Sequence, residues 1–227
     1  AESISQDGRE LTITIREKID LVPDATAKDY LQKRKIIDPI ENVAMDLLYH
    51  GCGHRELPVQ TKMGCPYNAE NHDQILDGVT RALKEIGKEA QAGYVANAVE
   101  DVIDLINAKR YTNLAGQVLF WHNEGVENNN QWTPFYEAFV KVNLNGMGEP
   151  ADATLLRKFY TPDKKVQEAV TQFKTYLAHT LDVPRLIKVY QNPDAVRRLF
   201  NRAKWKEIGY QFAKALGPLL PDSVEQN

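Results

Sequence analysis

Apolar residues recur every three or four positions in most of the long segments of this chain, which places them along one face of an α-helix. The stretch 93–109 shows this most clearly, with a stripe formed by Val95, Val99, Val102, Ile103 and Ile106. The same spacing predicts helices at 26–37, 39–57, 73–86, 134–144, 152–160, 163–179 and 184–215, the last broken near Asn192-Pro193. Residues 11–16 alternate apolar and polar side chains and predict a strand, whereas 116–121 fit a strand or a helix. The predicted fold class is therefore mainly α (α+β).

Composition narrows the classes of protein that this sequence can represent. The 227 residues are 43% hydrophobic, which is enough to bury a sizeable core. A net charge of −3 gives no basic field for nucleic acid or anionic lipid, and no apolar run approaches the roughly 20 residues that span a bilayer. No signal peptide is recognisable, so a soluble, cytoplasmic protein is expected. We interpret residues 1–150 as a core and 151–227 as a helical extension that can belong to the same domain.

The segment His50-Gly51-Cys52-Gly53-His54 carries the clearest chemical signal. Two histidines four positions apart on a helix project from the same side, here toward the apolar stripe, and both rings can bind one metal ion. A zinc site needs at least a third protein ligand, which Glu100 in the 93–109 helix can supply, with Asp101 as the alternative. One turn further on, Asp104 can accept the outer N–H of a histidine ligand and so fix its ring.

The order HxxxH on one helix and ExxxD on a later helix resembles the gluzincin metallopeptidases, which include the thermolysin-like enzymes. The apolar lead-in LLY and Gly53 directly before the second histidine add to the resemblance, which covers roughly residues 40–108. It implies a zincin-like core with a small N-terminal β element. It also implies that His50, His54 and Glu100 bind Zn²⁺, that Asp104 supports them, and that a peptide or protein is the partner.

One position departs from that family. Its members have a glutamate directly after the first histidine, as the general base that activates zinc-bound water, whereas this chain has Gly51. Either another group accepts the proton, or the chain is a degenerate peptidase; a non-catalytic helical scaffold is the alternative. Glu56 and His122 are the candidate catalytic groups, although Glu56 lies on a different side of the helix from His54 and His122 is typical of a half-buried surface residue.

Other interpretations of these residues stay open. The two histidines can be hydrogen-bonded core residues without a metal, and Glu100 can belong to a solvated helix face. Cys52, Cys65 and His72 can join the pair in a closed structural zinc site, because thiolate and imidazole together favour zinc. Their spacing matches no familiar zinc finger, and His72 also fits the beginning of a helix.

Overall fold

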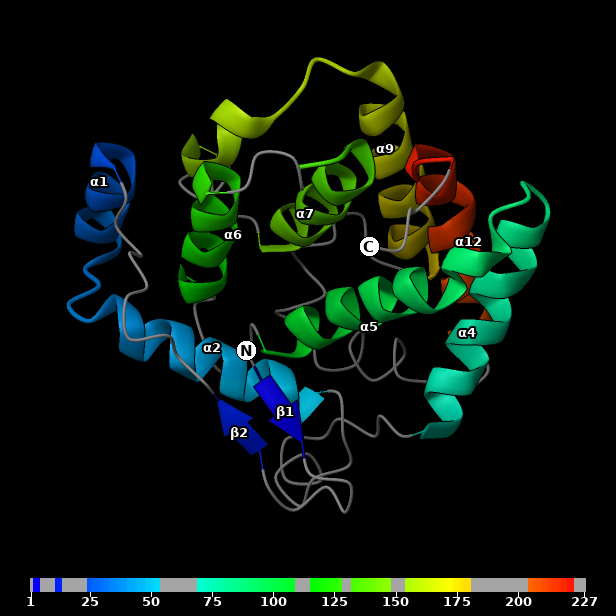
Figure 1. Cartoon of the computed structure of the whole chain (residues 1–227), viewed down its shortest axis with the longest axis horizontal. Coiled ribbons are helices and arrows are strands. Elements are labelled where there is room, and N and C mark those ends of the chain that lie inside the picture. Colours follow the sequence, from blue (N-terminus) through cyan, green and yellow to red (C-terminus); the bar gives the residue numbers. More distant parts are fainter. Residues whose placement is uncertain are drawn as a thin grey trace.

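The computed structural model describes residues 2–4, 11–13, 24–53, 69–108, 115–127, 132–147, 154–180 and 204–222. This part of the chain is mainly helical (Figure 1). Its helices are α1 (Ala25–Arg34), α2 (Pro39–Gly53), α4 (Ala69–Lys84), α5 (Ala92–Ala108), α6 (Ala115–Glu127), α7 (Pro134–Met147), α9 (Lys164–Thr180) and α12 (Trp205–Leu216). Short 3₁₀ turns are η1 (Glu89–Gln91), η3 (Arg157–Phe159) and η5 (Gly217–Leu219).

Two short strands lie beside α2 (Figure 1). Strand β1 (Glu2–Ile4) pairs antiparallel with β2 (Leu11–Ile13), and Glu2 lies opposite Ile13. Strand β2 covers the first three residues of the stretch 11–16, in which alternation predicts a strand. None of the helices among the described residues is both long and apolar enough to cross a membrane.

Helix α5 lies in the middle of the helices (Figure 1). It packs against α2, α4, α7 and α12, while α4 also packs against α12, and α2 against α6. One buried cluster joins helices from both sides of residue 150: Phe212 of α12 meets Phe135 of α7 and Phe173 of α9 edge-on, with ring centroids at 6.3 and 5.0 Å. The described part of the 151–227 extension therefore shares a hydrophobic core with the preceding helices.

Local signals set several helix ends where the sequence predicts them. Asp38 caps α2, because its Oδ1 accepts the N–H groups of the second and third helical residues at 2.9 and 3.0 Å, and Pro39 takes the first position, where no N–H is needed. Beyond α4, Gly87 adopts φ 71°, and the N–H of Lys88 reaches back to the carbonyl of Leu83 at 2.9 Å. This arrangement is the usual glycine stop of a helix.

Two segments show what the sequence pattern leaves open or gets wrong. Residues 116–121, which fit a strand or a helix, lie inside α6. Residue 215, where the last predicted helix ends, is not the end of the packed fold, since Leu219 and Leu220 are buried and Lys88 Nζ donates to the carbonyl of Leu220 at 2.5 Å. The predicted helical residues 54–57 and 184–203 lie outside the described residues.

Candidate functional site

Glu100 is a buried carboxylate on the central helix. Only 6% of its side chain is exposed, and it shares the buried face of α5 with Val99, Val102 and Ile103. Its Oε1 is in hydrogen-bond contact with Nδ1 of His72, which belongs to the first turns of α4 and is 44% exposed. A carboxylate is costly to bury without such a partner. The interpretation that Glu100 belongs to a solvated helix face is therefore wrong, because packing between α4 and α5 buries its side chain.

The helix that carries the first histidine lies next to the helix that carries Glu100. His50 and Cys52 are in the last turn of α2, and α2 packs directly against α5. The side chains of His50, Cys52 and Asp104 lie outside what the structure describes, as do the residues His54, Glu56 and Cys65. The backbone therefore brings together the two helices that carry His50 and Glu100, and the position of the histidine rings stays a prediction.

Among the side chains that the structure describes, no three His, Cys, Asp or Glu residues gather into a group able to hold a metal ion. The described donors at the predicted site are Glu100 and His72. Asp101, the alternative ligand, is half-buried, and its Oδ2 accepts a hydrogen bond from Asn97 on its own helix at 3.3 Å. Imidazole next to carboxylate is a donor pair that suits zinc.

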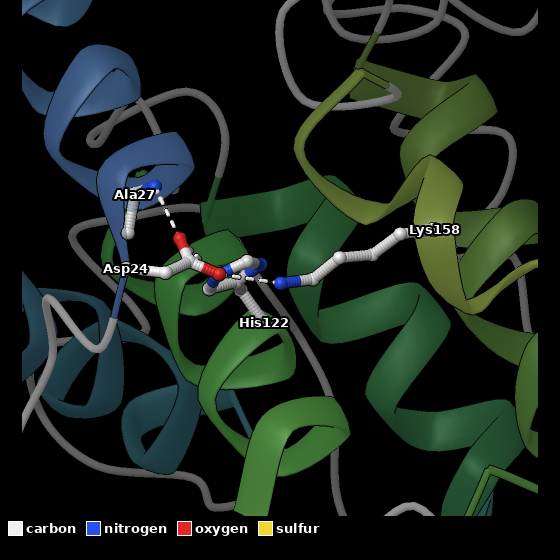
Figure 2. Close-up of polar contacts among 4 residues, drawn as sticks. All are labelled: Asp24, Ala27, His122 and Lys158. Carbon is white, nitrogen blue, oxygen red and sulfur yellow. Dashed lines mark hydrogen bonds and ion pairs between the residues drawn. The ribbon is translucent and has the colours of Figure 1, made fainter.

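His122 belongs to a separate polar cluster, which Figure 2 shows. Its ring is fully buried, and Nε2 lies 3.2 Å from Oδ1 of Asp24, the residue that caps α1 by accepting the N–H of Ala27 at 2.9 Å. Lys158 in η3 binds the other carboxylate oxygen of Asp24 at 2.5 Å. The cluster thus links α1, α6 and η3. Its geometry fits a structural role for His122 better than contact with a substrate.

The charges in this cluster follow from its geometry. Burial lowers the pKa of His122, although the nearby Asp24 carboxylate acts in the opposite direction. Burial would raise the pKa of Asp24, but the hydrogen bonds from Lys158 and from the N–H of Ala27 outweigh it and lower that pKa to about 2. At neutral pH the cluster therefore holds a neutral imidazole and an ionised carboxylate.

Sequence analysis had not singled out a third polar cluster, between α6 and α7. The hydroxyl of Tyr136 donates to Oε2 of Glu124, and burial raises the pKa of both groups. Burial raises the pKa of Tyr94 of α5, and the nearby carboxylates of Asp101 and Glu124 act in the same direction. These residues come from three separate helices and share no motif, so no local signal in the sequence could have found them.

Comparisons of the chain with protein families, with curated proteins and with solved structures find no match. The interpretation of the site therefore depends on its own residues.

Proposed function

We propose that this chain is a zincin-like metal-binding protein related to the zinc metallopeptidases, and specifically a degenerate or atypical peptidase. In this proposal His50, His54 and Glu100 bind one Zn²⁺, and Asp104 orients a histidine ligand. The observation that carries it is the buried carboxylate of Glu100, in contact with a histidine from another helix and on a helix that packs against α2. A cytoplasmic location and a peptide or protein partner belong to the same proposal.

The residues present fit such an ion. Two imidazoles and one carboxylate are a common set of protein ligands for zinc, and a dication compensates a carboxylate that is removed from water. When bound, zinc polarises a carbonyl and lowers the pKa of bound water. Gly51 offers no side chain to accept a proton at the position where the family has its base. The proposal therefore favours binding without efficient hydrolysis.

Metal analysis of the full chain tests the proposal. We expect about one zinc per chain after gentle purification, and competition with a chromophoric chelator should show affinity losses of at least about tenfold in His50→Ala and His54→Ala. His179→Ala is the matched control, because His179 is exposed on α9 and its Nδ1 lies 3.3 Å from the carbonyl oxygen of Thr175 on the same helix. A chain that contains no zinc and takes none up on titration would overturn the proposal.

A gain-of-function variant addresses the degenerate-enzyme part. Gly51→Glu restores a carboxylate where the family has its base, and at a zinc that keeps a position open for water it should confer peptidase activity that a chelator abolishes. The unaltered chain, assayed on the same unstructured protein substrate, should show little activity. Efficient cleavage by the unaltered chain would mean that another group already accepts the proton.

One observation favours the second candidate, a non-catalytic interaction protein. Large apolar side chains are exposed on α2 and just before it: Ile37 precedes the helix and is 98% exposed, and Ile40 and Leu48, eight positions apart on the helix, are partly exposed. Exposed apolar patches often mark contact with other proteins. If the chain holds no metal, and replacing Ile37 and Ile40 by Ser removes self-association or partner binding, the interaction function replaces the metal site.

A further inference from the structure

The three histidine side chains that the structure describes differ in their surroundings. His122 is fully buried against Asp24, and His179 is exposed on α9. His72 alone of these three contacts a carboxylate of the proposed zinc site, and it reaches Glu100 from a different helix. The contact joins residues 28 positions apart in the chain, so it is made by the packing of α4 against α5 and not by local sequence.

This placement suits coordination of the same ion by both side chains. Donor atoms of two ligands on one tetrahedral zinc lie roughly 3.4 Å apart, because each metal–ligand bond is about 2.0–2.2 Å long. Side chains that already meet at hydrogen-bond distance need only small rotamer changes to share an ion. His72 is also half-exposed while Glu100 is buried, so the pair lies at the surface end of the α4–α5 contact, where an ion can enter.

We propose that His72 is a fourth protein ligand of this zinc and closes its coordination sphere. The inference depends on the proposed function, since it adds a ligand to that site. Zinc sites with four protein ligands are structural, whereas catalytic sites keep a position open for water or substrate. With His72 bound, no position remains for a water that a base would activate, so on this assignment Gly51→Glu confers peptidase activity only when His72→Ala also opens a position. The closed site therefore explains why Gly51 can stand where the family has a glutamate, and the ion holds α2, α4 and α5 together.

Cobalt substitution of the full chain tests this assignment without any activity assay. Co²⁺ in the unaltered protein should give the strong visible absorption of a four-coordinate ion, and azide should leave that spectrum unchanged because no position is open. His72→Ala should bind Co²⁺ at least about tenfold more weakly. Its spectrum should respond to azide, which can occupy the vacated position. His179→Ala should behave as the unaltered chain.

A second variant separates ligation from a structural effect. His72→Cys replaces one zinc ligand by another, and it should bind Co²⁺ with a new thiolate-to-cobalt charge-transfer band in the near ultraviolet. A histidine that only supports the fold would give no such band. Far-UV circular dichroism of each variant checks that the helix content of the chain is unchanged.

The outcomes distinguish the two proposals. If the unaltered chain binds Co²⁺ and His50→Ala does not, but His72→Ala keeps the original affinity and spectrum, the fourth ligand is wrong and the metal site stands. The same conclusion follows if azide already changes the spectrum of the unaltered chain. If the unaltered chain binds neither Zn²⁺ nor Co²⁺, both proposals fail.

Discussion

The closest helix contact in the described fold predicts a large effect from one added methyl group. Helices α4 and α12 meet at two glycines, Gly78 of α4 and Gly209 of α12, each of which faces backbone atoms of the other helix. A Cβ atom on Gly78 would lie 1.9 Å from the carbonyl oxygen of Lys206, and a Cβ on Gly209 would lie 2.5 Å from that of Ile75. Both obstacles are backbone atoms within helices, which cannot move aside as a flexible side chain can. Gly78→Ala therefore has to push the two helices apart.

The magnitude follows from opposing terms. To bring the added Cβ of Gly78 to an ordinary contact distance, α4 and α12 have to move apart by about 1.5 Å. A gap between the two helices of even half that size forfeits a quarter or more of the dispersion energy of the atoms that line it. The buried side chains at this crossing include Ile75, Val79, Ile208 and Phe212. Overpacking of this kind costs about 1–3 kcal/mol, while alanine gains up to about 1 kcal/mol in helix propensity over glycine. Adding the lost contacts, we expect a net loss of about 2–4 kcal/mol.

Urea unfolding followed by far-UV circular dichroism measures this change as a shift of the midpoint. Gly93→Ala is the matched control, since this glycine is also helical and, in the described structure, a Cβ there would meet nothing within 4 Å. The control should be neutral or up to about 1 kcal/mol more stable than the unaltered chain. If Gly78→Ala unfolds within about 0.5 kcal/mol of the unaltered chain, the reasoning from the close crossing is wrong.

Three further variants test the polar clusters. The pKa of Asp24 is about 2 in the folded chain, against 3.8 for the unperturbed group, so its ionised form stabilises the fold above pH 4 and this contribution is lost as the pH falls through 2. Between pH 4 and pH 2, the urea midpoint of Asp24→Asn should therefore change less than that of the unaltered chain. Burial lowers the pKa of His122, so as the pH drops below 6.5 this histidine binds a proton in the unfolded chain before it does so in the folded chain, and the free energy of unfolding falls. His122→Gln should remove this dependence of the urea midpoint on pH between pH 7 and 5. Tyr136→Phe removes the donor to Glu124, which should cost about 1–3 kcal/mol and raise the pKa of Glu124 further, as carboxyl NMR titration would show.

The helices could be predicted wherever their signals are local. Asp38, Pro39 and Gly87 act on backbone groups within a few residues, so the start of α2 and the stop after α4 are readable from sequence. Residues 116–121 could not be assigned, because a short apolar run fits a buried strand as well as a helix. The burial of Leu219 and Leu220 could not be predicted, because residues that bind this segment, Lys88 and Gln91 between α4 and α5, lie more than a hundred positions earlier.

The site could be predicted only in outline, for the same reason. The four-residue spacings identified His50, His54, Glu100 and Asp104 as candidates, because residues on one helix turn are neighbours whatever the tertiary fold. The contact between His72 and Glu100 spans 28 positions. The cluster of His122, Asp24 and Lys158 spans up to 134. Contacts of this kind depend on which helices meet, and no single-sequence pattern encodes that.

Two buried glutamates allow a final comparison, because their surroundings differ in kind. Glu137 is fully buried, and its Oε2 accepts hydrogen bonds from the N–H and hydroxyl of Thr161 at 3.0 and 2.8 Å, while Oε1 binds Lys141. These donors belong to the fold, so Glu137→Gln, which leaves a cation unpaired, should cost about 3 kcal/mol whether zinc is present or not.

Glu100 instead contacts His72, a residue type that itself binds zinc, so part of its contribution to stability should depend on the metal. Zinc at a hundred times its dissociation constant stabilises a folded chain by about 2.7 kcal/mol, and a chelator removes that gain. In Glu100→Gln the difference between thermal unfolding with zinc and with chelator should shrink, whereas in Glu137→Gln it should stay as in the unaltered chain. Equal zinc-dependent stabilisation in both variants would show that Glu100, like Glu137, is only part of the fold.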